Sequence, residues 1–138
     1  MQELSYKDIN IGDKASFEKT IAESDIYQFA GITGDFNPLH VNADFAKNSL
    51  FKERVAHGIL TAGFISTVLG MKLPGTNSVY LSQTLNFLAP VKIGDTVKAE
   101  VTVIDKHDEK KIIRLRTVVK NQLRVTVVDG EATVLKLI

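Results

Sequence analysis

The sequence predicts an α+β fold in which a curved antiparallel sheet wraps around one helix. The first observation is an uncharged run, Gly58 to Met71, whose apolar residues cover nearly every direction around a helix, a pattern typical of a buried helix. The second is a series of later segments that alternate apolar and polar residues, as half-buried strands do. A sheet with one apolar face must cover something, and this helix is the element hydrophobic enough to be covered.

The first part of the chain predicts one strand and one amphipathic helix. Lys14 to Thr20 is the strand candidate. Thr20 and Glu23 fit a capping box for the helix that follows, and Ser24 is a competing N-cap. We expect this helix from about Asp25 to Ile32, because apolar residues recur there at helical spacing, and Gly34 is a plausible C-terminal stop.

Two further helices are predicted before the strands begin. Asn42 is expected to cap a short helix that carries Phe45 and Ala46. Residues 48–54 are predicted to form a polar connection. The uncharged helix then starts around Gly58, and we expect it to end at or shortly after Gly70.

Four strand segments are predicted in the second half of the chain. Ser78 to Leu88 comes first, Thr96 to Lys106 alternates strictly, and Ile113 to Lys120 follows a charged hairpin tip. Leu123 to Leu137 is the last segment, interrupted by Asp129-Gly130. That pair fits either a hairpin turn or a bulge in one long strand. We prefer the bulge, because too few residues remain for a separate strand of matching length.

The composition bounds the class of protein. The 138 residues are enough for one domain with its own hydrophobic core. The formal net charge of +1 gives no reason to expect nucleic acid or an anionic membrane as a partner. The absence of cysteine excludes disulfides and thiolate metal sites. No signal peptide and no apolar run of bilayer-spanning length is visible. We therefore expect a cytoplasmic protein with a single domain, residues 1–138.

Residues 34–40 (Gly-Asp-Phe-Asn-Pro-Leu-His) concentrate proton-transfer chemistry in one turn. Pro38 disfavours a continuous helix, so a turn would hold Asp35 and His40 and could aim both side chains at one point. A carboxylate and an imidazole that converge on one water form a general acid/base pair. Asn37 would orient one of them or bond the backbone as an Asx-turn residue. The alternative is ordinary turn chemistry beside a solvent-exposed or packed histidine.

The dipeptide His57-Gly58 opens the uncharged helix. Free backbone N–H groups and the positive end of the helix dipole lie at such a position, which suits a carbonyl that gains negative charge in a transition state. The alternative is that Gly58 only lets the backbone enter a crowded core. We expect no metal site, because the three histidines have no acidic residues at ligand spacing. Neither a phosphate-binding glycine loop nor a serine nucleophile elbow is present.

The stretch from Phe29 to His40, followed by Ala46, resembles the hydratase signature of the MaoC-like family, which includes the (R)-specific enoyl-CoA hydratases. The resemblance covers essentially the whole chain. It implies a hot-dog fold, an antiparallel sheet around a long central helix, in agreement with the patterning. It also implies a homodimer with the two sheets joined edge to edge and the substrate near the subunit boundary. The other similar segments are Val55–Leu60, Leu73–Gly75, Tyr80–Leu81, Phe87, Pro90–Val91 and Gly94–Val97.

The resemblance also implies a site and a reaction. Asp35 and His40 resemble the pair that holds the catalytic water and moves its protons, and the N–H of Gly58 resembles the oxyanion donor for a thioester carbonyl. Asn37 would shape the motif or support the pair at the substrate site, and Ser66 sits where the family lines the acyl pocket. The implied reaction is reversible hydration of a trans-2-enoyl-CoA such as crotonyl-CoA to the (3R)-hydroxyacyl-CoA, without a cofactor.

Two other functions and several details stay open at this level. Hot-dog proteins also serve as acyl-CoA thioesterases, in which Asp35 would activate water toward the carbonyl, although the Asp-x-Asn-Pro-x-His spacing favours hydration. A non-catalytic acyl-thioester-binding subunit is a third possibility, against which the retained Asp35 and His40 argue. The first proton acceptor and the carrier, coenzyme A or acyl carrier protein, are open. Acyl chain length depends on pocket depth, set by residues such as Ser66 and Leu69. The candidates for binding the CoA phosphates are Arg54, Lys72 and Lys111.

Overall fold

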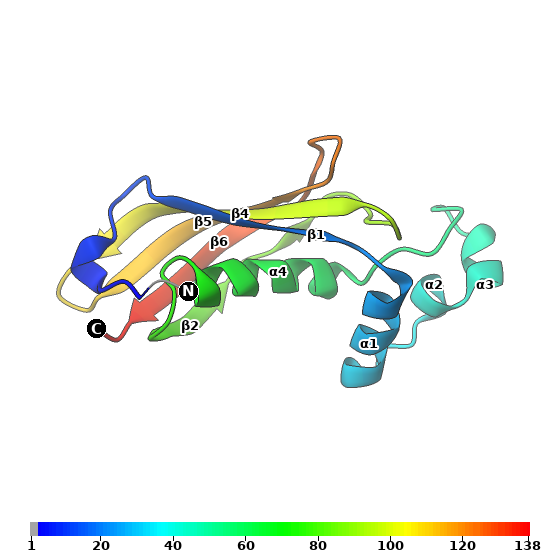
Figure 1. Ribbon diagram of the computed structural model, residues 1–138. Coiled ribbons are helices and arrows are strands. Elements are labelled where there is room, and N and C mark those ends of the chain that lie inside the picture. Colours follow the sequence, from blue (N-terminus) through cyan, green and yellow to red (C-terminus); the bar gives the residue numbers. More distant parts are fainter. Residues whose placement is uncertain (1–2) are drawn as a thin grey trace.

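The structure is a computed structural model that describes residues 3–138. One antiparallel sheet of six strands lies against a long helix, and three shorter helices extend beyond one end of the sheet (Figure 1). The strand order is β1-β4-β5-β6-β2, with β3 paired to β6. The elements in chain order are η1 (Tyr6–Asp8), β1 (Lys14–Thr20), α1 (Glu23–Thr33), α2 (Pro38–Val41), α3 (Ala43–Lys47), α4 (Gly58–Met71), β2 (Ser78–Gln83), β3 (Asn86–Phe87), β4 (Thr96–His107), β5 (Ile112–Lys120) and β6 (Thr126–Lys136).

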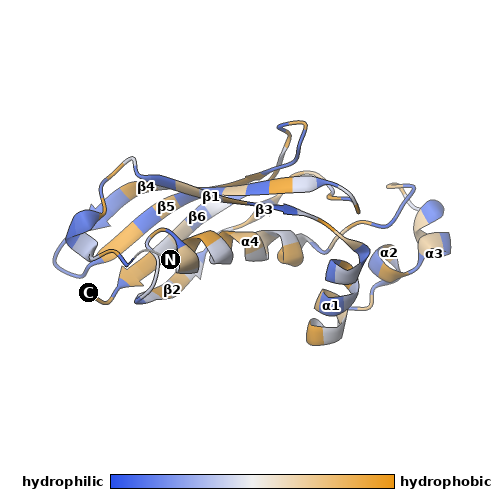
Figure 2. Ribbon diagram, viewed as in Figure 1, coloured by the Kyte–Doolittle hydropathy of each residue, from blue (hydrophilic) through white to orange (hydrophobic). Residues whose placement is uncertain are grey.

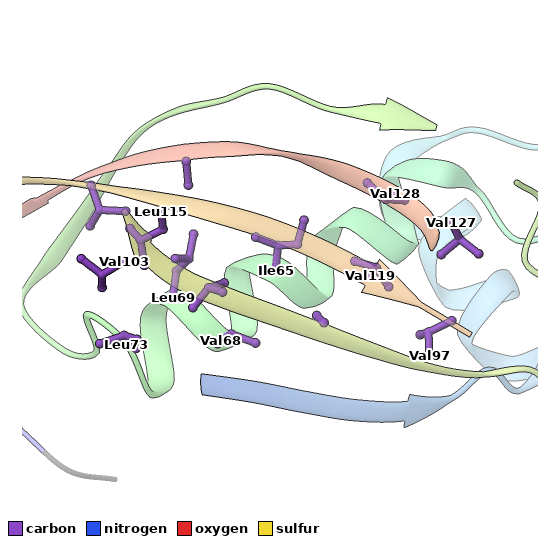
Figure 3. Packing of buried hydrophobic residues seen from close by; sticks show 14 of the residues in the cluster. Ile65, Val68, Leu69, Leu73, Val97, Val103, Leu115, Val119, Val127 and Val128 are labelled. Atoms are coloured by element: carbon purple, nitrogen blue, oxygen red, sulfur yellow. The ribbon is translucent and has the colours of Figure 1, made fainter. Parts of the chain in front are cut away.

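The core lies between α4 and the concave face of the sheet. Ile65, Val68 and Leu69 of α4 belong to one buried cluster with strand side chains such as Val97 and Leu115 (Figure 3). Ile65, Val68 and Leu115 are completely buried, and each such side chain contributes about 1.5–3 kcal/mol relative to an exposed one. The predicted α+β architecture, a sheet wrapped around one helix, is therefore confirmed.

The sheet covers only one side of α4. Ile59, Gly63, Ser66 and Gly70 are exposed and recur at helical spacing along the opposite side. The expectation of a helix buried on every side is thus wrong for the single chain, because one sheet can cover only one face of a helix. Figure 2 shows apolar residues along α4. The exposed side of the helix carries one large apolar residue, Ile59, among small residues.

The strands β4 and β5 follow the predicted alternation. In β4 the side chains at every second position from Val97 to Val103 are buried, and in β5 the same holds from Ile113 to Val119. The two strands pair with Val101 opposite Thr117, so their apolar sides share the face toward α4. Alternating hydropathy along these strands is visible in Figure 2.

The segment predicted as one strand from Ser78 to Leu88 is divided into β2 and β3. The regular strand breaks at Thr84, whose N–H still donates to the Glu131 carbonyl on β6 at 2.9 Å. The carbonyl oxygen of Thr84 lies against Gly130, and a Cβ built on that glycine would be 1.8 Å from this oxygen. The last strand, β6, runs without a turn through Asp129-Gly130, as predicted. Its pairing irregularity with β5 falls instead between Val119 and Lys120, so the predicted position of the bulge is wrong. Gly130 permits the close approach of the segment around Thr84 and pairs in register with Thr117 of β5.

The start of α1 also differs from the prediction. Thr20 is the last residue of β1, and α1 begins at Glu23. The carboxylate of Asp25 accepts the backbone N–H of Ala22 at 2.8 Å and so caps the helix from within its first turn. Both the Thr20–Glu23 capping box and the Ser24 N-cap are therefore wrong, because cross-strand pairing of Thr20 extends β1 to the residue where the cap was expected.

The helices α1, α2 and α3 lie past the end of the sheet at which α4 begins, whereas the two termini lie near the other end (Figure 1). The N-terminal end of α4 therefore faces a group of short helices, and the predicted site residues gather there.

Within residues 3–138, no helix combines the length and the apolar character needed to cross a membrane.

Candidate active site

A tight loop after α1 presents Asp35. Gly34 ends α1 in the left-handed conformation, with φ of 82°, which glycine adopts without steric cost. The N–H of Asp35 donates to the hydroxyl of Thr33 at 3.2 Å, and its carboxylate accepts the N–H of Asn37 at 3.2 Å. The predicted helix stop at Gly34 is confirmed, and the Asp35 side chain remains exposed at the surface of the loop.

Asn37 builds the turn that carries His40. Its side-chain oxygen accepts the N–H of Leu39 at 3.1 Å and caps α2, whose first residue is Pro38. Pro38 suits this position because its ring already holds a helical φ and it has no N–H to satisfy. Of the two roles expected for Asn37, the structure contains the backbone-bonding one. Asn37 is not among the residues that line the neighbouring pocket.

His40 has one ring nitrogen engaged and one available. Its Nδ1 lies 2.7 Å from the carbonyl oxygen of Val55. A carbonyl can only accept, so Nδ1 carries the hydrogen and donates it. Nε2 is then the unprotonated nitrogen of the neutral ring and is free to take a proton. The His40 side chain is half-buried, and it forms part of the wall of a pocket.

His57 brings the two predicted residues together. Its ring is buried, its Nε2 lies 2.9 Å from the backbone carbonyl oxygen of Asp35, and it stacks on His40 with 3.8 Å between ring centroids. Side-chain atoms of Asp35, His40 and His57 lie within 4.8 Å of one another. Reasoning from the sequence treated His57 only as the residue before a helix. The only sequence signal was a histidine directly before that helix, because the residues that His57 contacts are distant from it in the chain.

Three such groups at this distance can hold a metal ion, which the sequence did not lead us to expect. However, Nδ1 of His40 and Nε2 of His57 are already bonded to carbonyl oxygens. The atoms left over are the carboxylate of Asp35, Nε2 of His40 and the buried Nδ1 of His57. The first two suit the handling of protons and water as well as they suit metal ligation.

A pocket of about 500 Å³ lies beside this group at the start of α4. Gly58 is the first residue of α4, so its N–H has no acceptor within the helix and is available to a ligand. A Cβ at Gly58 would lie 2.6 Å from the ring of Phe87, which explains on steric grounds why glycine occupies this position. The two readings of Gly58, a close approach and a free donor, are therefore compatible. The remaining wall is mostly apolar and includes Leu39, Phe51, Val55, Ile59, Leu88, Val91, Val127 and Val128.

The other predicted substrate residues lie away from this pocket. Ser66 is on the exposed side of α4, and Leu69 is 3% exposed within the core. Neither is among the residues that line the pocket in the single chain. Their predicted effect on acyl chain length therefore stays a prediction, and it requires that the substrate also run along the outer side of α4.

The three candidate phosphate-binding cations are spread over the molecule. Arg54 forms an ion pair with Glu23 and donates to the Tyr27 hydroxyl at 3.0 Å; the hydrogen bond to Glu23 raises the pKa of Arg54. Lys72 follows α4 and lies about 20 Å from the start of that helix, since a helix rises about 1.5 Å per residue. Lys111 is in the β4–β5 turn at the far end of the sheet (Figure 1). Only Arg54 lies near the site.

Similarity to known proteins identifies the family of the chain. The model of the MaoC like domain matches residues 8–125. The chain belongs to this family. It is 54% identical over 130 residues to an (R)-specific enoyl-CoA hydratase of Rhodospirillum rubrum, covering 94% of this chain and 90% of that protein. It is 47% identical over 131 residues to a 3-hydroxybutyryl-CoA dehydratase of Methylorubrum extorquens, covering 95% and 83%.

Solved structures of MaoC-like proteins share the fold. An R-hydratase from Pseudomonas aeruginosa, unliganded, superposes with a TM-score of 0.92 at 42% identity, covering 97% of this chain and 86% of that one. An (R)-hydratase from Aeromonas caviae gives the same TM-score at 38% identity, covering 94% and 98%. The predicted family and the predicted hot-dog fold are both confirmed.

Proposed function

We propose that this MaoC-like protein is an (R)-specific enoyl-CoA hydratase. It adds water reversibly across a trans-2-enoyl-CoA and forms the (3R)-hydroxyacyl-CoA. The observation that carries the proposal is the convergence of Asp35 and His40 beside a pocket that also contains the free N–H of Gly58. The similarity to hydratases and a dehydratase that the chain covers almost completely supports the same reaction.

The geometry divides the reaction between two parts of the site, the Asp35–His40 pair and the N–H of Gly58. A water held by the carboxylate of Asp35 and by Nε2 of His40 would give its oxygen to C3 of the enoyl group and a proton to C2 from the same side. The C2=C3 double bond becomes single, and negative charge passes transiently to the thioester oxygen. The N–H of Gly58, at the positive end of α4, would stabilise that oxygen. Asp35 and His40 together then return to their starting protonation state, whichever takes the first proton.

The proposal gives each remaining residue a limited role. Asn37 shapes the loop that presents Asp35 and His40, and this role requires no contact with the substrate. The apolar wall of the pocket, with Phe87 and Val91, suits a hydrocarbon acyl chain. No step in this scheme requires a cofactor, because both the oxygen and the proton that are added come from one water molecule.

We further propose that the protein acts as a homodimer of single-domain subunits. Val79 and Leu81 on the edge strand β2 are 40% and 48% exposed, and Phe87 on β3 is 52% exposed. An edge strand with exposed apolar side chains favours pairing with another strand. Such pairing would join two sheets edge to edge. Light scattering at micromolar concentration is expected to give twice the 15.2 kDa mass of one chain; a monomer under these conditions would contradict the proposal.

The assay for the proposed function is loss of the conjugated absorbance of crotonyl-CoA. The wild-type protein is expected to remove it and to form the 3R product, and His40→Gln is expected to reduce the rate by about 10²–10⁴-fold. His107→Gln is the matched control, because His107 lies exposed at the end of β4. Equal activity of His40→Gln and wild type would refute the assignment of the site.

The same experiment separates the two alternatives. An acyl-CoA thioesterase would release free thiol from crotonyl-CoA or butyryl-CoA, which a thiol reagent detects. A non-catalytic subunit would bind the enoyl-CoA without removing its absorbance. Hydration without thiol release is the expected outcome. Repeating the hydration assay with longer acyl chains, and with an acyl-carrier-protein thioester, identifies the preferred substrate.

A further inference from the structure

His57 is a buried residue to which the reaction scheme above gives no role. It is 2% exposed and precedes α4 directly. Its ring lies between Phe29 on α1, with 4.8 Å between centroids, and His40 on α2, at 3.8 Å. Its Nε2 contacts the backbone of Asp35 at 2.9 Å. His57 therefore touches both members of the proposed acid/base pair.

The hydrogen-bond pattern defines the form of the His57 ring. The carbonyl of Asp35 can only accept, so Nε2 of His57 carries the hydrogen. Nδ1 is buried and has no hydrogen-bond partner among residues 3–138. The ring therefore holds the Asp35 loop through the hydrogen bond that Nε2 donates.

We propose that His57 is a positioning residue that fixes Asp35 and His40 relative to the start of α4. The inference rests on the proposed hydratase function. The bonds from the Asp35 N–H to Thr33 and from the Asn37 N–H to the Asp35 carboxylate are both local, spanning two residues each. The bond from His57 spans 22 residues and attaches the loop of Asp35 to α4.

The ring of His40 depends on the same short segment. Its Nδ1 donates to Val55, and its face rests on His57. Residues 55–57 also lead directly into Gly58, the proposed oxyanion donor. One three-residue segment therefore sets the distance between the proposed acid/base pair and the proposed oxyanion donor. A displacement of about 1 Å in such a geometry can cost about 10²-fold in rate.

Two substitutions separate the hydrogen bond of His57 from the space it fills. His57→Phe keeps a ring against His40 and removes the donor to Asp35. His57→Gln keeps a donor, because the glutamine amide nitrogen is the same number of bonds from Cβ as Nε2. His107→Gln is the control for the substitution itself, since His107 is exposed on β4.

The expected result is a loss confined to turnover. With crotonyl-CoA, His57→Phe should lower kcat by about 10²-fold with little change in KM, and His57→Gln should recover at least about tenfold of that loss. His107→Gln should match wild type. Equal kcat values for His57→Phe and wild type would overturn the proposal. So would equal losses in His57→Phe and His57→Gln accompanied by equal drops in thermal midpoint, because that pattern indicates only a structural role.

A spectroscopic measurement tests His57 independently of activity. In ¹⁵N-histidine-labelled wild-type protein at neutral pH, His57 is expected as the tautomer with hydrogen on Nε2, assigned by its absence in His57→Gln. The opposite tautomer would overturn the inference even in an active enzyme. If wild-type protein does not hydrate crotonyl-CoA, the proposed function fails, and the tautomer still decides whether His57 holds Asp35 as inferred.

Discussion

Replacing Gly58 by alanine tests whether the start of α4 is a working part of the site. The new Cβ would lie 2.6 Å from the ring of Phe87, whereas ordinary contact begins at 3.4 Å, so the ring or the helix start must move by about 0.8 Å. Phe87 is half-exposed and can shift, so the free energy of unfolding should fall by only about 1 kcal/mol, the low end for overpacking. The distance between the Gly58 N–H, which is the proposed oxyanion donor, and the Phe87 ring would change by nearly 1 Å. We therefore expect kcat to fall by about 10²-fold.

The assay is hydration of crotonyl-CoA combined with urea unfolding, performed as a double-mutant cycle with Phe87→Ala. In the Phe87→Ala background no ring opposes the new methyl group, so Gly58→Ala should then change kcat by less than about threefold. Two results would refute the reasoning. The first is wild-type kcat in Gly58→Ala, and the second is a loss that persists in full after Phe87 is removed, since the clash would not be its cause.

Three further predictions concern other parts of the molecule. Asp35→Asn should lower the hydration rate by about 10²–10⁴-fold, whereas Asp44→Asn on the exposed helix α3 should leave it unchanged; equal rates in both variants would contradict the role of Asp35. Gly130→Ala should reduce the free energy of unfolding by about 3 kcal/mol or more in urea, because its Cβ would lie 1.8 Å from the Thr84 carbonyl oxygen; a stable variant would show that the two strands can separate there. Burial, followed by the hydrogen bond that its hydroxyl donates to a carboxylate, raises the pKa of Tyr6 from 10.0 to about 12. The folded chain then keeps a proton that the unfolded chain releases, so stability should fall as pH rises from 10 to about 12 and should fall less in Tyr6→Phe.

Local pattern was sufficient for most of the fold. The alternation in β4 and β5 and the uncharged run of α4 each reflect which face of one element leaves water, and neighbouring residues encode that directly. The turn at residues 34–40 was also predictable, because Gly34 can adopt the left-handed conformation without steric cost and Pro38 fixes its own φ. The family signature then assigned chemistry to Asp35 and His40 before any contact between them was known.

The predictions that were wrong concern residues whose conformation depends on contacts with distant segments of the chain. Thr20 pairs across β1 and β4 and does not cap a helix, and the strand predicted from Ser78 to Leu88 breaks where it meets Gly130. The open side of α4 was likewise not predictable, because a sequence that is apolar all round does not say how many faces one sheet will cover.

The sequence by itself predicted a sheet wrapped around one helix, since strand alternation and the uncharged run are short-range patterns. The family resemblance added the hot-dog fold and the proposed roles of Asp35 and His40. Tertiary structure alone decided how the site is held together. His57 reaches the Asp35 carbonyl across 22 residues and stacks on His40, and Phe87 explains why position 58 is glycine. These contacts depend on the folded path of the chain, which brings the start of α4 against the loop after α1, and no local spacing records that approach.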